Sequence, residues 1–213
     1  HAGNISNSSA LVFNTSNDQS LSGVLSGTGT LNVDGGNVSN TGTGYIGLST
    51  GSNGTVNVRY GTWANSGDLK VGDAGTGILT IANFGLVTVS GNLTRGSLGT
   101  INLNAGGTLQ IGTGGTTGTL LGGNGDLTNN GSLIFNRSNA STYSGVLSGS
   151  GVVEKQGTGT LTLSGNGNSV GGISVTAGPA TTAGRAGSNC TGVARSVSTR
   201  STPSTRATAA TKS

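Results

Sequence analysis

The chain has 213 residues, of which 43 are glycine, and only 8% of its residues are charged. Disordered proteins usually carry a high net charge, and collagen repeats glycine at every third position with abundant proline. This chain has irregularly spaced glycines and two prolines, so both classes are excluded. The composition favours many short strands joined by tight, glycine-rich turns.

Charged residues are distributed unevenly along the chain. Residues 1–178 contain five basic and six acidic side chains, whereas residues 179–213 contain five basic side chains and no acidic one. The second segment also holds both prolines and the only cysteine, Cys190. We therefore expect a main domain over 1–178 and a low-complexity basic tail over 179–213, which is either disordered or encoded in a shifted reading frame.

Short alternations of apolar and polar residues follow one another through the main domain, each bounded by glycine. A period of two is typical of strands with one buried face. In chain order the alternating apolar pairs are Leu31/Val33, Val56/Val58, Leu79/Ile81, Val87/Val89, Ile101/Leu103, Leu109/Ile111, Leu133/Phe135, Leu161/Leu163 and Ile173/Val175. No stretch has the spacing of an amphipathic helix, and no apolar run reaches the ~18 residues of a membrane-spanning helix. We expect an all-β protein without a membrane-spanning segment.

Two internal repeats organise these strands. Residues 7–29 and 129–151 are identical at 13 of 23 positions, including SGVLSG in both. A finer repeat aligns the segment that begins at Ile46 with the segment that begins at Val71, so that Tyr60 falls on Phe84 and Leu69 on Leu93. A repeat length of roughly 20–25 residues is typical of solenoids, whose units bury their apolar faces against their neighbours.

The period predicts a solenoid of roughly 7–9 coils, or about 35–45 Å of stacked strands, over residues 1–178. The longer repeat is expected to mark two equivalent places along the stack. A globular β-sandwich is the main alternative, but it does not account for the finer repeat.

Two stretches carry a resemblance to a known family. GYIGLSTGSNGTVNVRYGTWANSGDLKVGDAGTGILTIANFG, at 44–85, resembles the repeats of autotransporter passenger domains of Gram-negative bacteria, in which "W-x-N-S-G-D-L" phrases alternate with "GTLTI" phrases. Residues 125–178, with NRS, YSGVLSGSG and GTGTLTLSG in that order, look like the passenger-associated transport repeat. A related phrase lies near 7–36. Two features depart from the family: GNSVGGISV lacks an aromatic residue, and the repeats end at Gly178.

The resemblance implies a right-handed parallel β-helix that is exported through the periplasm to the bacterial cell surface or outer membrane, or released. Its implied partner is its own C-terminal β-barrel translocator, which is absent from this sequence. The expected function is a structural, secretion-supporting stalk, part of an adhesin, with a host surface protein or glycan as a further partner. The alternatives are a fragment of a polysaccharide-active β-helix enzyme and a glycan-binding surface module.

Several motif matches are expected to be turns rather than sites. GNSVG at 167–171 fits a nucleophile elbow around Ser169, but that motif needs a following helix and a histidine base, and the only histidine is His1. GTGYIG at 42–47 lacks the helix that a dinucleotide fingerprint requires. GGNGDL at 122–127 places Asp126 one position early for a calcium-binding β-roll. Asp68 and Asp73 are expected to be turn residues, not a glycosidase pair. No enzyme activity, cofactor, metal or nucleic-acid partner is expected.

Four aromatic residues lie close together in the sequence: Tyr45, Tyr60, Trp63 and Phe84. If they share an outer face, they form a strip that could contact sugars or a host protein. The alternative is local packing at the corners of coils.

Overall fold

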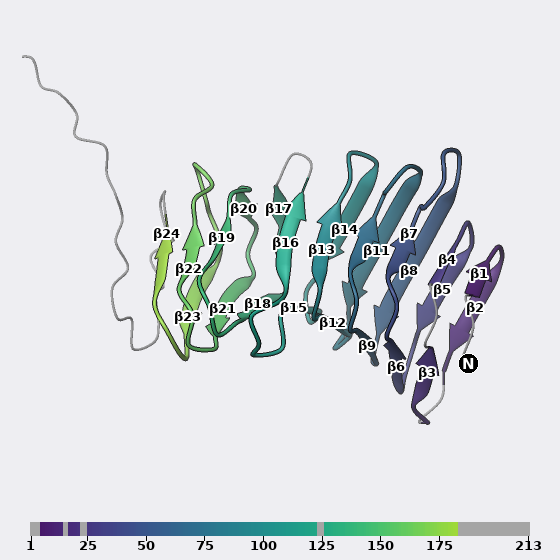
Figure 1. Ribbon diagram of the computed structural model, residues 1–213, viewed down its shortest axis with the longest axis horizontal. Helices are drawn as coiled ribbons and strands as arrows, with labels where there is room; N and C mark the ends of the chain where they lie inside the picture. Colours follow the sequence, from purple (N-terminus) through teal and green to yellow (C-terminus); the bar gives the residue numbers. More distant parts are fainter. Residues whose placement is uncertain (1–4, 15–16, 22–24, 123–125, 183–213) are drawn as a thin grey trace, which may run out of the picture.

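The computed structural model describes residues 5–14, 17–21, 25–122 and 126–182. These residues form 24 strands and no helix (Figure 1). Strands that neighbour one another in a sheet pair in parallel and come from successive coils. The prediction of an all-β parallel solenoid is confirmed.

The strands fall into three stacks, and successive coils contribute strands to them in the order A, B, C as far as β21; the last described coil runs from β22 in stack A directly to β23 in stack C. Stack A contains β1 (Ile5–Asn7), β4 (Leu25–Gly27), β7 (Gly44–Ile46), β10 (Leu69–Val71), β13 (Asn92–Arg95), β16 (Thr119–Gly122), β19 (Ser141–Tyr143), β22 (Leu161–Leu163) and β24 (Ala180–Thr182). Stack B contains β2 (Ala10–Phe13), β5 (Thr30–Val33), β8 (Asn53–Arg59), β11 (Thr76–Ala82), β14 (Gly99–Leu103), β17 (Leu127–Thr128) and β20 (Leu147–Ser148). Stack C contains β3 (Gln19–Leu21), β6 (Asn37–Asn40), β9 (Thr62–Asn65), β12 (Leu86–Val89), β15 (Thr108–Ile111), β18 (Ser132–Asn136), β21 (Val152–Gln156) and β23 (Gly172–Val175).

The finer sequence repeat corresponds to one coil. Ile46 pairs with Val71 in stack A, and Leu69 pairs with Leu93 in the coil that follows. These are the positions that the repeat aligns. Stack C is a continuous eight-stranded sheet, which gives about seven turns. This agrees with the predicted 7–9 coils.

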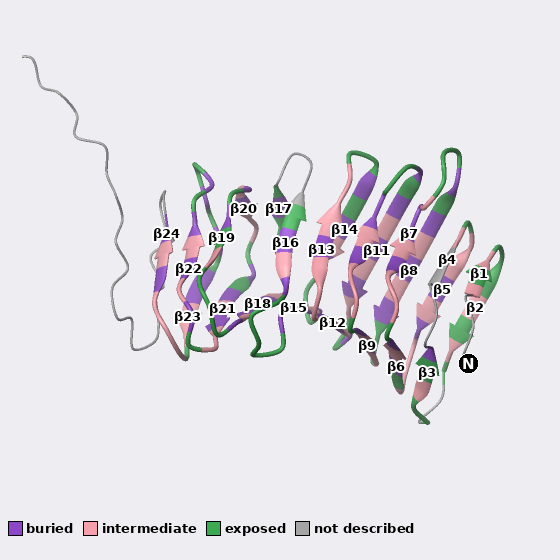
Figure 2. Ribbon diagram, in the orientation of Figure 1, coloured by how far each residue is buried: buried purple, intermediate pink, exposed green. Residues whose placement is uncertain are grey.

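The core is a narrow apolar column inside the three stacks. Buried and partly exposed residues alternate along the strands, as the sequence pattern predicts (Figure 2). In β11, for example, Leu79 and Ile81 point inward and are fully buried, while Thr80 between them lies on the outer surface. Each coil therefore buries its apolar residues against the coils before and after it.

A column of glycines marks the corner where coils enter stack C, at Gly61, Gly85, Gly107 and Gly131. The carbonyl of each accepts a hydrogen bond from the first stack C residue of the next coil, as in Gly61 O with Leu86 N at 2.9 Å. A Cβ atom at Gly107 would lie 2.4 Å from the Ile81 carbonyl oxygen, and one at Gly131 would lie 2.3 Å from the Gly107 oxygen. Glycine is required there because successive backbones approach too closely for a side chain.

The longer repeat encodes a corner that is used on two different sides of the solenoid. Asn7 donates from Nδ2 to Thr30 O at 2.9 Å and accepts from Ser9 N at 3.2 Å. Asn129 donates to Val152 O at 2.9 Å and accepts from Gly131 N at 3.1 Å. However, Asn7 connects stack A to stack B, whereas Asn129 connects stack B to stack C. The prediction of equivalent places along the stack is therefore wrong: the phrase specifies local corner hydrogen bonds, and these fit more than one corner.

The solenoid extends beyond the predicted boundary at Gly178. Residues 180–182 form β24, which pairs with β22, and Ala180 and Thr182 are buried. Residues 180–182 of the predicted tail therefore belong to the solenoid, and its residues 183–213 lie outside the described part of the chain.

Candidate binding surface

Two of the four aromatic residues form an exposed pair at the corner between stacks B and C. Tyr60 follows β8 and is 63% exposed, and Phe84 follows β11 in the next coil and is 82% exposed. Their ring centroids are 6.5 Å apart, and the ring planes are tilted by 37°. The finer sequence repeat aligns Tyr60 with Phe84, and the structure places the two residues in the same column of successive coils.

The backbone at this corner is in an unusual conformation for large side chains. Tyr60 has φ 56°, Asn83 φ 50° and Phe84 φ 64°. A positive φ is rare for bulky residues and costs about 1–3 kcal/mol when the surrounding structure imposes it. Hydrogen bonds between coils impose it here: Tyr60 N donates to Asn83 O at 3.0 Å, and Phe84 N donates to Gly106 O at 2.8 Å.

Glycines precede and follow the pair in the same column. Extending the stack C register by two residues places Gly35 opposite Tyr60 and Gly106 opposite Phe84. Gly106 has φ 75°, a left-handed conformation that favours glycine. No side chain from the adjoining coils therefore covers the pair from those two positions.

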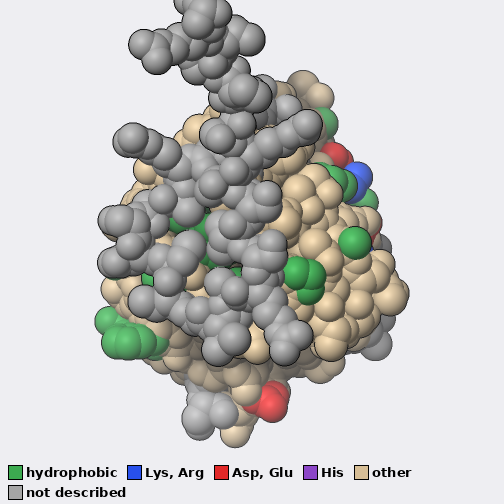
Figure 3. Space-filling model, turned by 90° about the vertical axis from the view of Figure 1, so that its left-hand side faces the viewer, with side chains coloured by type: hydrophobic (Ala, Val, Ile, Leu, Met, Phe, Trp, Pro, Cys, Tyr) green, Lys and Arg blue, Asp and Glu red, His purple; other side chains and the backbone are tan. Residues whose placement is uncertain are grey.

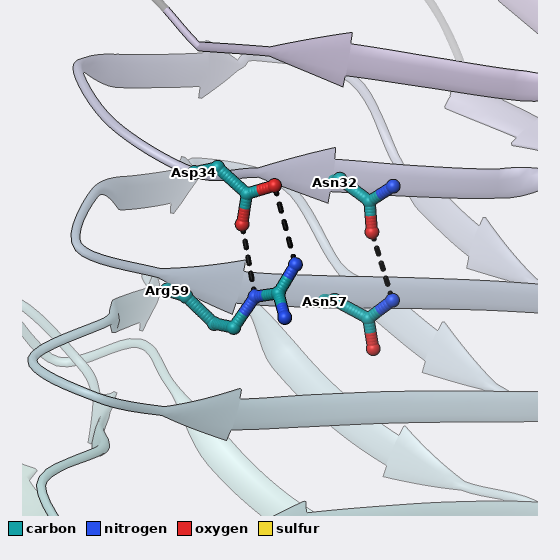
Figure 4. A network of polar contacts seen from close by, with 4 residues as sticks. All are labelled: Asn32, Asp34, Asn57 and Arg59. Carbon is teal, nitrogen blue, oxygen red and sulfur yellow. Dashed lines mark hydrogen bonds and ion pairs between the residues drawn. The ribbon is translucent and has the colours of Figure 1, made fainter.

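Polar side chains lie on stack B beside the pair. Arg59 donates to Asp34 through Nε to Oδ1 at 2.9 Å and through Nη2 to Oδ2 at 3.2 Å (Figure 4). Hydrogen bonding to Asp34, together with the negative charge of Asp34, raises the pKa of Arg59 above its usual value. Two residues earlier on the same outer face, Asn57 Nδ2 donates to Asn32 Oδ1 at 2.8 Å. The surface next to the rings is thus polar and locally uncharged overall.

The other two aromatic residues are not part of this surface. Trp63 is the second residue of β9 and is fully buried in the core, so its inclusion in an outer strip was wrong. Trp63 falls three residues after Tyr60, beyond the corner, at an inward position of the next strand. Tyr45 is half-buried on stack A, where the Lys70 ammonium lies 5.3 Å from the centre of its ring. Corner positions and inward positions cannot be told apart from the sequence without the strand register.

A second feature is a polar cleft between β14 and β17. Stack B is interrupted there: β14 and β17 belong to separate sheets, and an isolated bridge connects Leu103 of β14 with Asn129, the residue after β17. The cleft has a volume of about 250 Å³ and is lined by Arg95, Thr100, Ile101, Asn102, Leu103, Asn104, Asp126, Leu127, Thr128 and Asn130. Tyr143 lies behind it, next to Arg95, Asp126 and Leu127, and burial raises its pKa to about 12. The cleft offers one basic and one acidic side chain with amides and hydroxyls, a lining suited to polar ligands.

Two basic side chains in the coils after β15 are buried and have structural contacts. Arg137 donates from Nη1 to Gly118 O at 2.6 Å and from Nη2 to Thr116 O at 2.7 Å. Lys155 occupies an inward position of β21, donates to the carbonyls of Gln156, Gly157 and Ala177, and has a pKa lowered by burial. Neither role has a signal in the sequence, since both depend on carbonyl groups at corners that only the fold brings near these side chains.

The motif matches lie in strands and turns. Gly44–Ile46 of GTGYIG form β7, and Ser169 bridges to Ser148 with no helix after it in the described residues. Asp126 Oδ1 accepts from Val146 N at 2.9 Å, and residues 123–125 of GGNGDL lie outside the described residues. Asp68 accepts from Asn92 N at 2.7 Å, and Asp73 pairs with Lys70 at 3.5 Å.

The described residues contain no group of three or more His, Cys, Asp or Glu side chains that could hold a metal ion. They also form no helix of the length and apolarity needed to cross a membrane. Comparisons with protein-family models, with curated proteins and with solved structures find no match to this chain.

Proposed function

We propose that this chain is a structural stalk segment of an autotransporter-type surface protein of Gram-negative bacteria, exported through the periplasm and part of an adhesin. The observation that carries the proposal is the repetition of one three-strand coil along the described chain, with each coil paired to the next. Such a stack is extended, since each added coil contributes one strand spacing of ~4.8 Å. The resemblance of WANSGDL at 63–69 and NRS at 136–138 to phrases of this family supports the assignment to it.

The same architecture supports a role in secretion. Each coil pairs with the preceding coil in the continuous sheet of stack C and packs its core against it, so the chain can fold one coil at a time as it emerges. Folding outside the membrane would then oppose backsliding. In this proposal a C-terminal β-barrel translocator is the partner, and the stack itself performs no catalysis.

Surface display tests the proposal. The full chain, fused between a signal peptide and an autotransporter β-barrel, should become accessible to protease on intact Gram-negative cells. A matched Gly107→Val fusion, in which the added side chain meets the Ile81 carbonyl, should accumulate inside the cell. Equal display of both fusions would contradict the secretion-supporting role, and failure of the unaltered fusion to reach the surface would contradict the family assignment.

The alternative, a polysaccharide-active enzyme, is tested separately. Purified chain incubated with pectin-like and other glycans should release no new reducing ends. Release that is lost on substitution of Asp126 or Arg95 in the β14–β17 cleft would replace the stalk proposal with an enzymatic one.

A further inference from the structure

The corner that holds Tyr60 and Phe84 carries large aromatic side chains at positions where the neighbouring coils have glycine. Gly106 has φ 75° in the same column and Gly35 precedes the pair. Tyr60 and Phe84 adopt the same left-handed region with large side chains, and they remain mostly exposed. Two residues that are strained and gain little burial contribute to stability less than glycine would. The stability of the fold therefore does not account for aromatic residues at these two positions.

We propose that Tyr60 and Phe84 form a stacking platform for the pyranose rings of a neutral glycan. A pyranose ring has an apolar face of C–H groups and an edge of hydroxyls, so it fits an aromatic face that is bordered by polar side chains. The two rings lie in successive coils with centroids 6.5 Å apart. Neighbouring sugars of one oligosaccharide running along the solenoid can contact both rings.

The residues beside the rings can bind the hydroxyls. Arg59 uses Nε and Nη2 for Asp34, and a guanidinium has five N–H donors, so donors remain on its exposed side. Asn57 Nδ2 is bonded to Asn32, which leaves the Asn57 carbonyl oxygen directed away from that bond (Figure 4). Arg59 and Asn57 thus supply a donor and an acceptor on the same outer face of β8.

Other ligand classes fit this corner less well. Single-stranded nucleic acid stacks on aromatic rings but needs a positively charged groove, and here the charge of Arg59 is offset by Asp34. A stable protein interface buries about 800 Å² on each partner around apolar anchors, whereas the positions beside this pair carry Asn, Asp and Arg. Seen from the end that carries β24, the atoms that are not drawn in grey include few charged side chains (Figure 3). A neutral glycan is the class that uses both the rings and their polar border.

Binding to neutral hexasaccharides tests the proposal. Saturation-transfer NMR of the full chain with cellohexaose, chitohexaose and maltohexaose should show transfer to ring protons of at least one of them. The Tyr60→Gly and Phe84→Gly variants should each weaken that binding roughly tenfold. Because glycine accepts a positive φ, both variants should keep or raise the melting temperature, which separates lost binding from lost folding.

Leu98→Ala is the matched control, because Leu98 is another exposed apolar side chain, at 52%, that lies between β13 and β14. It should bind like the unaltered chain. The proposal is overturned if none of the three hexasaccharides binds, or if binding persists in the double glycine variant. Binding that appears only with an anionic glycan such as heparin would also overturn it. None of these outcomes depends on whether the chain is a secreted stalk.

Discussion

Trp63 fills the space that Gly44 leaves in the core of the same coil. At the position of Gly44 in stack A, the next three coils carry Leu69, Leu93 and Leu120. A Cβ atom on Gly44 would lie 3.5 Å from Trp63 Cζ2 and 2.9 Å from Leu69 Cδ1. In stack C, the positions that flank Trp63 are Val38 and Val87. Where the neighbouring coils have leucine in stack A and valine in stack C, this coil thus has glycine and tryptophan.

Because Gly44 and Trp63 compensate for each other, replacing only one of them with the residue type found in the neighbouring coils should destabilise the fold. Trp63→Val should lower the free energy of unfolding by about 2–4 kcal/mol, because it leaves a cavity beside Gly44. Gly44→Leu alone should also destabilise, by about 1–3 kcal/mol, because the indole occupies the space. Urea denaturation followed by circular dichroism measures both changes.

The double variant is the decisive comparison. If the two residues share one space, Trp63→Val combined with Gly44→Leu should recover part of the loss, with a coupling free energy of about 1–3 kcal/mol. Additive losses would show that the two sites are independent. Trp63→Phe is a milder control, since it retains a ring and removes the indole N–H, which has no hydrogen-bond partner among the described residues.

The glycine column predicts a contrast between two glycines. Gly107→Ala should destabilise by about 1–3 kcal/mol, because its Cβ would lie 2.4 Å from a backbone oxygen that cannot move aside. Gly115→Ala should have little effect, because no atom lies within 4 Å of the Cβ position. Equal melting temperatures for the two variants would contradict a steric role for the column.

Strand positions and inward residues could be predicted from the sequence, because the alternation of apolar and polar residues and the glycines at strand ends are local signals. The pairing of Tyr60 with Phe84 followed from the finer repeat, which the register confirms. The burial of Trp63 could not be predicted, because a small shift at a corner moves a side chain from outside to inside. The side of the solenoid on which each long repeat lies was also inaccessible, because coils differ in length: the step from Leu133 to its partner Val153 is shorter than the step from Leu31 to Val56.

Hydrogen bonds at corners predict a second contrast, between two adjacent asparagines. Asn129 is fully buried and satisfies both Val152 O and Gly131 N. Asn129→Ala should cost about 1–3 kcal/mol, because the buried amide of Asn129 is lost and the partly buried Val152 O and Gly131 N–H lose a partner. Asn130 is exposed and accepts from Ser150 N at 3.1 Å, so Asn130→Ala should cost less than about 1 kcal/mol. A smaller effect at Asn129 than at Asn130 in urea titrations would contradict this assignment.

Tyr143 predicts a loss of stability in alkaline solution. Its pKa is raised from 10.0 to about 12, first by burial and then by Asp126, while Arg95 acts in the opposite direction. Between these values the unfolded chain releases the phenol proton and the folded chain retains it. The free energy of unfolding should therefore fall by about 2 kcal/mol as the pH rises from 10 to 12.

The Tyr143→Phe variant isolates this effect, because the phenyl ring can keep its contact with Phe135, whose ring centroid lies 6.3 Å away. Lys155 contributes in the opposite direction: burial lowers its pKa below 10.5, so stability rises with pH as the unfolded value is approached from below. That contribution is common to both proteins and cancels in their difference. Urea titrations at intervals from pH 9 to 12 should therefore show a steeper decline for the unaltered chain than for Tyr143→Phe, and parallel curves would show that Tyr143 ionises equally in the folded and unfolded states.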